Sequence, residues 1–576
     1  MPSKLRRRKR SHTPTQAVPN KKPRSSKRQV DTIDIRDDPK PTKAGKPRIT
    51  LTISSKRNQR ALARLPTRVD TIFRQQMPIE IHQMIAEYLP EDADVTSYAS
   101  ICKSSYASIS ASVWCKRYAN TFDAVGNNTP EQIMKKYMFR RQVTLSQPIF
   151  DVVPHRRHLE AMGQMEDNSE NQRWCLEMLK ELILESDARM GYDEEGNVAV
   201  IGLNLQYIKE LIDWKWPNAN GRGHTDIMTR CPLAMSQGNL ANADGILPLI
   251  MVIQSCLISF LLRPGTCDGT AVHFDDSQRQ AYTCRIQEPL FKGIYKQHLN
   301  VHWVLNVANF FKLHLKARNE GLFYNVYHDL TPDQLPQHWL GKIKSGTQEF
   351  GSHWKGAYTF LDEDALVAMR SNARSEDPYM DEINDGHELL QDLTIFFDED
   401  RFPSTKWPTQ WQMFLRSDPF KGVPNTALED TPTRRTRSRS IKDKTKPVTP
   451  VFKNFFGSGV DGKMSRFFGC LHSVPAQQGI HGFQRVTMMK FFPDDNGDYD
   501  ENQVWAYEGC VLPGGRIILG RWWAVRDEIF GERIPLTGPF IFWNVESSDA
   551  EVRVTGNEAM EFLHSINDPL MMGDFQ

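Results

Sequence analysis

The apolar residues of this chain change their spacing near residue 345. Between 121 and 345 they recur three or four positions apart, which indicates helices that bury one face. Residues 301–315 (VHWVLNVANFFKLHL) are apolar nearly all round, so we expect a fully buried helix there. Residues 245–262 (GILPLIMVIQSCLISFLL) carry no charge but contain Pro248 and three polar side chains. We therefore interpret this segment as a buried helix rather than a membrane span.

After residue 345 the apolar residues form short runs that are rich in aromatic and β-branched side chains. Gly and Pro separate these runs, a pattern typical of antiparallel strands. The Pro-Gly-Gly sequence at 513–515 lies between two such runs and predicts a hairpin turn. Residues 346–576 are therefore predicted to form a β-rich domain, either a barrel or a sandwich.

A compact helical block is predicted at residues 73–120. Pro78 suits the first turn of a helix, where its missing N–H costs nothing. The spacing predicts three short helices, which have too little surface to enclose a full core of their own. We expect their remaining apolar side chains to be covered by another polypeptide; the alternative is packing against the rest of this chain. The apolar stripes contain Ile81, Ile85, Tyr88 and Leu89, then Tyr98, Ile101 and Cys102, then Val113 and Trp114.

Charge is distributed unevenly along the chain. Residues 1–70 contain 21 Lys and Arg against five Asp, a net charge of +16, so the remainder carries −14. Residues 1–72 contain no aromatic side chain, and we expect this basic tail to be disordered. Residues 424–450 are also polar, basic and free of aromatics, and they predict a disordered loop inserted in the β-rich domain. The fold class is therefore multidomain α+β, with a tail, a helical block, a helical middle region and a β-rich domain.

Two basic clusters in the tail predict nuclear import. They are separated by a polar spacer and suit the acidic grooves of an import receptor. The alternative is a solvating tail or one that adheres to RNA; the acidic body is a poor nucleic-acid partner. The residues are Lys4, Arg6, Arg7, Arg8, Lys9 and Arg10, then Lys21, Lys22 and Arg24.

No motif in the chain makes a convincing catalytic or metal site. The nine cysteines are scattered without a CxxC pair, which argues against a zinc cluster. The sequence from Gly457 to Lys463 approaches a phosphate-binding loop, but Met464 replaces the Ser or Thr that holds Mg²⁺, and a glycine-rich turn before a strand explains it. Two HxD pairs, starting at His224 and His273, lie in predicted helical sequence, away from the barrel that an iron triad requires. We expect no catalytic residue, metal or cofactor.

The segment MPIEIHQMIAEYL followed by SYASICKSSYASISASVWCKRY resembles the F-box, over about 45 residues. Met77 stands where the family has Leu, a swap of similar volume. The resemblance implies a three-helix F-box that binds the adaptor subunit of an SCF (cullin-RING) ubiquitin ligase. The residues expected to bind the adaptor are Met77, Pro78, Ile81, Ile85, Leu89, Ile101, Cys102 and Trp114.

The C-terminal strings IHGFQRVTMMKFF, VWAYEGCVLPGGRIILGRWW and GPFIFWNV are similar to the C-terminal domain of a group of fungal F-box proteins. They are more distantly similar to the substrate-binding β-domain of the animal F-box receptor for cyclin D. This implies a substrate-recognition module. Neighbouring strand residues face opposite ways, so either Trp522 or Trp523 should be exposed or covered by a loop. Candidate substrate contacts are Trp505, Tyr507, Arg521, Trp522 and Trp523, and the alternative is that these rings fill the core.

Together these observations predict a non-catalytic substrate receptor of an SCF ubiquitin ligase, located in the nucleus. Its partners would be the adaptor with its cullin-RING ligase, a protein substrate and an import receptor, without a membrane or nucleic acid. Two alternatives remain open. One is a nuclear nucleic-acid-associated scaffold that uses the basic tail, and the other is a metal- or nucleotide-dependent enzyme.

Overall fold

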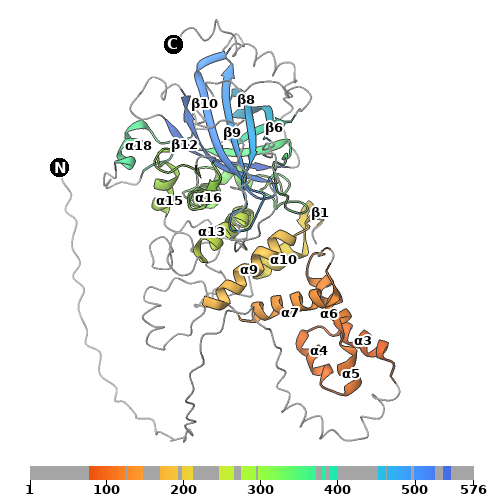
Figure 1. Ribbon diagram of the computed structural model, residues 1–576. Coiled ribbons are helices and arrows are strands. Elements are labelled where there is room, and N and C mark those ends of the chain that lie inside the picture. The colour runs from red at the N-terminus through yellow and green to blue at the C-terminus, as the bar shows by residue number, and fades with distance from the viewer. Residues whose placement is uncertain are drawn as a thin grey trace, which may run out of the picture. The chain divides into compact units, whose positions relative to one another are not determined.

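The computed structural model describes most of the chain between residues 77 and 545 (Figure 1). The described residues are 77–124, 126, 128–146, 169–192, 198–211, 246–264, 274–293, 296–371, 379–383, 390–397, 452–461, 463–493, 499–525 and 536–545. The basic tail, the loop 424–450, both basic clusters and the HxD residues His224, Asp226 and His273 lie outside them. Among the described helices, none combines the length and apolar character needed to cross a bilayer.

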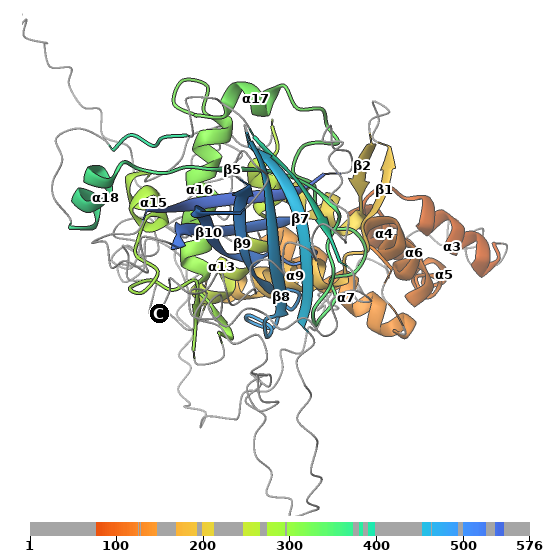
Figure 2. The ribbon, with the colours of Figure 1, turned by 90° about the horizontal axis from the view of Figure 1, so that it is seen from above.

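The first described segment forms four helices where the sequence predicted three. The additional break between helices falls at Ile101 and Cys102, two residues that the sequence analysis placed in one apolar stripe with Tyr98. Cys102 instead begins a new helix, because its thiol accepts the backbone N–H of Ser105 while the Ser105 hydroxyl receives the Cys102 N–H. The helices are α3 (Ile79–Tyr88), α4 (Asp92–Ala99), α5 (Lys103–Ser108) and α6 (Ala111–Thr121), which cluster together in Figure 2.

The described residues of the middle region are mainly helical, and among them are two short β-ribbons. Residues 246–262 of the uncharged segment are mostly buried but form two helices, because Leu257 leaves helical geometry (φ −101°, ψ 11°) and the Ser255 hydroxyl bonds back to Val252. The predicted helix 301–315 is present and buried on nearly all sides. The elements are α7 (Pro130–Ser146), α9 (Ser169–Glu185), β1 (Arg189–Tyr192), β2 (Val198–Ile201), α10 (Leu203–Glu210), α13 (Ile246–Cys256), α14 (Ile258–Leu262), α15 (Phe274–Ala281), β3 (Phe291–Lys292), β4 (His298–Leu299), α16 (Val301–Lys316) and α17 (Tyr324–His328).

The C-terminal part is a closed antiparallel barrel of eight strands, which confirms the predicted β-rich architecture. The predicted hairpin joins β10 to β11, and Gly514 and Gly515 adopt the positive φ angles of that turn. Gly457 and Gly459 lie within β7 and not in a turn before a strand, which corrects the sequence interpretation. The strand order is β10-β11-β12-β5-β6-β7-β8-β9. The elements are β5 (His353–Tyr358), α18 (Glu363–Arg370), β6 (Gln391–Phe396), β7 (Phe452–Asp461), β8 (Lys463–Ser473), β9 (Gln484–Pro493), β10 (Tyr499–Val511), β11 (Ile517–Ala524) and β12 (Thr537–Asn544).

Aromatic rings fill the inside of the barrel, where all eight strands contribute to one apolar cluster. Several rings lie over strand glycines that leave room for them. A Cβ built on Gly469 would come within 1.9 Å of the ring of Phe455, its partner on the neighbouring strand. Cluster members from β5 to β12 in turn include Trp354, Leu393, Phe455, Phe467, Val486, Tyr507, Ile518 and Phe540.

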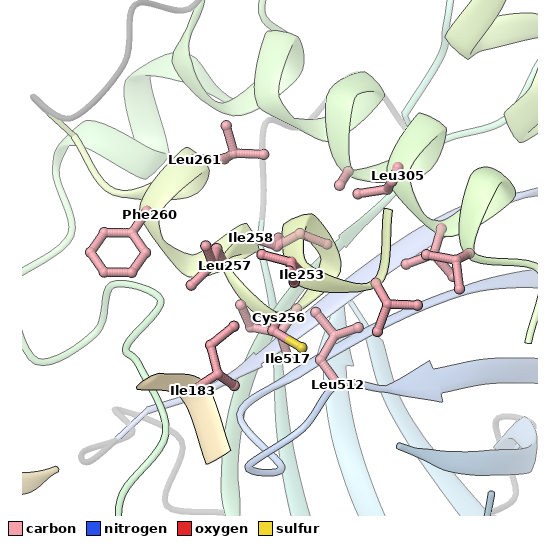
Figure 3. Packing of buried hydrophobic residues seen from close by; sticks show 14 of the residues in the cluster. Ile183, Ile253, Cys256, Leu257, Ile258, Phe260, Leu261, Leu305, Leu512 and Ile517 are labelled. Atoms are coloured by element: carbon pink, nitrogen blue, oxygen red, sulfur yellow. The ribbon is translucent and has the colours of Figure 1, made fainter. Parts of the chain in front are cut away.

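The outside of the barrel shares a second apolar core with the middle helices. Ile517 of β11 and Trp543 of β12 belong to the same buried cluster as residues of α13 and α16. Figure 3 shows Ile253 and Cys256 of α13 beside Leu512 and Ile517. The helices and the barrel thus bury one continuous core across residue 345, where the sequence analysis placed a boundary.

Candidate functional site

The four helices α3 to α6 enclose a small core. Ala86, Tyr98 and Val113 are its buried apolar members, and the partly buried side chains of Ile85, Leu89 and Ile109 pack against them. His82 is also completely buried, and its Nδ1 lies 2.5 Å from the Tyr98 hydroxyl. Burial raises the pKa of Tyr98 above its ordinary value. Ala86 and His82 thus mark the inner side of α3.

The outer side of α3 carries a stripe of apolar side chains. Ile81, Met84 and Tyr88 follow one another at intervals of three and four residues, which places them on one helical face, and Met77 precedes the helix. Met84 is 50% exposed and Tyr88 79% exposed. Helix α5, which packs against α3, adds the exposed ring of Tyr106, and Ile101 precedes it. We call the exposed side chains of Ile81, Met84, Tyr88, Ile101 and Tyr106 the apolar docking surface; Ile79 is also exposed, but it starts α3 on the helical face of buried Ala86.

The ion pair of Lys116 and Glu87 borders this surface. Lys116 of α6 donates to Glu87 at 2.7 Å and lies 5.7 Å from the centre of the Tyr88 ring. The hydrogen bond to Glu87 and the charge of that carboxylate raise the pKa of Lys116. Exposed apolar side chains of this number on two adjoining helices are typical of a surface that binds another protein.

The eight predicted adaptor-binding residues fall into exposed and buried groups. Pro78, Ile81 and Ile101 are exposed and Met77 is half-buried, whereas Ile85 and Leu89 pack inward. Cys102 and Trp114 are buried; the Trp114 ring lies 5.7 Å from Tyr137. We therefore correct the assignment of Cys102 and Trp114, which belong to this chain's own interior.

Sequence reasoning missed three members of the docking surface. They are Met84, Tyr88 and Tyr106, none of which is among the eight predicted adaptor-binding residues. The spacing of Met77, Ile81, Met84 and Tyr88 could have indicated one exposed apolar face. However, Ile85 and Leu89 fit a second apolar stripe on the same helix, and the sequence does not say which of the two faces outward. Burial of His82 and Ala86 decides between the two, because it identifies the inner face of the helix.

Four of the five candidate substrate contacts are buried and Trp505 is partly buried, so the buried four lie in the interior and not on a recognition surface. Tyr507 and Trp522 lie inside the barrel, and Trp505 packs against the same cluster with its ring 5.3 Å from Trp522. Trp523 faces outward but is covered by Arg285, whose guanidinium lies 4.2 Å from its ring. The sequence alternatives of a loop-covered tryptophan and a ring-filled core are thus confirmed.

Arg521 lies on the outer face of the barrel and is 1% exposed. It stacks 4.4 Å from the Trp303 ring and donates to the carbonyl oxygens of Thr283 and Glu288. Burial lowers the pKa of Arg521 to about 10. This side chain joins α16 to the barrel and is not accessible to a substrate.

In the described part of the chain, no three His, Cys, Asp or Glu side chains gather in a way that could hold a metal ion. Comparisons with protein-family models, with curated proteins and with solved structures find no match to this chain.

Proposed function

We propose that this chain is the substrate-recognition subunit of an SCF ubiquitin ligase. The observation that carries the proposal is the apolar docking surface on α3 and α5, within the segment that resembles the F-box. The alternative, that this segment is sealed against the chain's own interior, requires those side chains to be buried, and all five are exposed. Covering a half-exposed Ile, Met or Tyr side chain contributes about 1 kcal/mol, so five supply a substantial part of a stable interface.

The mechanism that follows is tethering. An adaptor bound at the docking surface connects the chain to the ligase, and a substrate held by the rest of the chain has its lysines kept close to the charged ubiquitin carrier. This raises the effective concentration of the lysine and requires no acid, base or nucleophile from this chain. Because Tyr507, Arg521, Trp522 and Trp523 are buried, the side chains proposed to capture the substrate are others in the helical and β-rich regions.

Nuclear location is part of the same proposal. The basic clusters around Lys4–Arg10 and Lys21–Arg24 are the residues expected to bind an import receptor. Replacing both clusters by alanine should move a fluorescently tagged chain from the nucleus to the cytoplasm, and unchanged nuclear fluorescence would reject this part of the proposal.

The decisive experiment measures binding of the full-length chain to the purified adaptor by titration calorimetry. The double variant Met84→Ala/Tyr88→Ala removes two exposed side chains from a helix that tolerates alanine. We expect binding at least about 30-fold weaker, from about 1 kcal/mol for each side chain. The matched control is Met380→Ala/Tyr192→Ala, which removes the same two residue types at sites 72% and 73% exposed and should bind like the wild type.

The two possible failures have different meanings. A wild-type chain that does not bind the adaptor rejects the receptor function. A wild-type chain that binds, with the Met84/Tyr88 variant binding equally well, places the adaptor elsewhere and rejects the docking surface.

A further inference from the structure

One arginine holds the end of the helix that carries most of the docking surface. Arg117 of α6 donates from Nη1 to the carbonyl oxygen of Leu89 at 2.7 Å and from Nη2 to that of Pro90 at 3.0 Å. These carbonyls follow α3, where the helix dipole favours a positive charge. The third nitrogen, Nε, donates to Asp92 at 2.9 Å. A single guanidinium therefore connects the end of α3 to the start of α4.

Asp92 receives two further donors from α7. The Tyr137 hydroxyl donates to Oδ1 at 2.8 Å, and Arg141 Nε donates to Oδ2 at 2.5 Å. Burial alone would raise the pKa of Asp92, but the hydrogen bonds of Tyr137 and Arg141 and the charges of Arg141 and Arg117 hold it below its ordinary value. The carboxylate is thus charged and bonded on both oxygens.

Helix α3 depends on its neighbours. It is ten residues long and its first turn has no side-chain cap. A helix of this length is unstable in isolation and depends on tertiary contacts. The small core around Ala86 and the Lys116–Glu87 ion pair hold its sides, and the guanidinium of Arg117 adds the hydrogen bonds to the carbonyls at its C-terminal end.

We propose that Arg117, Asp92, Tyr137 and Arg141 form a clasp that holds α3 in the orientation that binds the adaptor. The adaptor-binding unit then extends through α7 to Ser146, beyond the helices that resemble the F-box. This inference rests on the proposed function and adds four positioning residues, none of which belongs to the docking surface. Tyr137 also packs against Trp114, so the clasp and the apolar contact between α6 and α7 support each other.

The test uses the full-length chain and the purified adaptor, with Arg141→Gln as the main variant. Arg141 lies on α7 and donates to Asp92, so its replacement tests whether Asp92 transmits an effect to α3. We expect about tenfold weaker adaptor binding and faster hydrogen exchange of the α3 amides before adaptor is added. Tyr137→Phe, which keeps the ring against Trp114 and removes one donor, should weaken binding about threefold. Arg189→Gln is the matched control, because Arg189 is 81% exposed and pairs with Asp187 at 3.5 Å.

Affinity is measured at a temperature where every variant is folded, so that a loss of stability alone leaves the dissociation constant unchanged. Equal adaptor binding by Arg141→Gln and wild type overturns the clasp while leaving the receptor function intact. Weaker binding without faster α3 exchange also overturns it, because Arg141 would then contact the adaptor directly. A wild type that fails to bind rejects the receptor function and the clasp with it.

Discussion

Replacing Glu185 by Gln removes a charge that joins α9 to α7. The Glu185 carboxylate accepts Arg140 Nη2 at 2.5 Å, and it also receives Lys136. The Arg140 side chain is completely buried, with its guanidinium 4.6 Å from the Phe122 ring and its Nη1 donating to Tyr118. Glutamine keeps the shape of the side chain but leaves this buried cation without its nearest carboxylate.

The size of the effect follows from the burial of both partners. Breaking a fully buried ion pair costs about 3–5 kcal/mol. Glu185 is 21% exposed, and the Glu181 carboxylate lies 3.7 Å from the same Arg140 nitrogen, so we expect a smaller loss, about 2–3 kcal/mol. Glu181→Gln is the matched control. Glu181 is 42% exposed and more distant, so its loss should be below about 0.5 kcal/mol.

Hydrogen exchange read by mass spectrometry measures this difference in the intact chain. The amides of α7 and α9 exchange through opening of their contact, so a loss of 2–3 kcal/mol accelerates them roughly 30- to 160-fold. The Glu181→Gln chain should exchange within about threefold of wild type. Equal acceleration by the two variants would refute the argument, because it would show that burial of Arg140 does not raise the cost of losing its partner.

Three other outcomes follow from the fold. Gly514→Ala should cost at least about 2 kcal/mol in urea unfolding, because φ is +92° and the new Cβ would lie 2.0 Å from Trp339 Cβ; Gly126→Ala, with no atom within 4 Å, should not. Trp354→Ala leaves a cavity in the barrel interior and should lower the free energy of unfolding by about 3–5 kcal/mol. Because the pKa of Asp92 is lowered in the folded chain, its carboxylate stabilises the fold above pH 3.8, and this stabilisation is lost as the pH falls through the lower folded pKa. In Asp92→Asn the free energy of unfolding should therefore depend less steeply on pH in that range.

The sequence predicts an element well where one physical requirement dominates. Residues 301–315 are apolar nearly all round, which favours a buried helix, and α16 spans Val301–Lys316. Pro513, Gly514 and Gly515 leave little choice but a tight turn, and the hairpin between β10 and β11 is present. In both cases the local sequence was enough to predict the element without knowledge of its long-range contacts.

The candidate sites depended on contacts that spacing does not reveal. Alternation places Trp522 and Trp523 on opposite faces, but whether the outer face meets solvent depends on Arg285, 238 positions earlier than Trp523 along the chain. Similarly, Tyr88 and Leu89 are both apolar and adjacent, and the distant α6 determines that Leu89 turns inward. The pattern of apolar residues shows which side chains share a face, but it does not show which face a distant segment of the chain will cover.

The opposition of Phe455 and Gly469 across β7 and β8 constrains how this barrel can vary. Enlarging the glycine alone collides with the ring, and shrinking the ring alone leaves an empty space, so each single change is penalised. A simultaneous exchange of bulk between the two sites keeps the total volume and avoids both penalties. The constraint therefore acts on the summed volume of facing side chains on neighbouring strands and not on either residue alone. A chain that differs at both positions can still enclose the same interior.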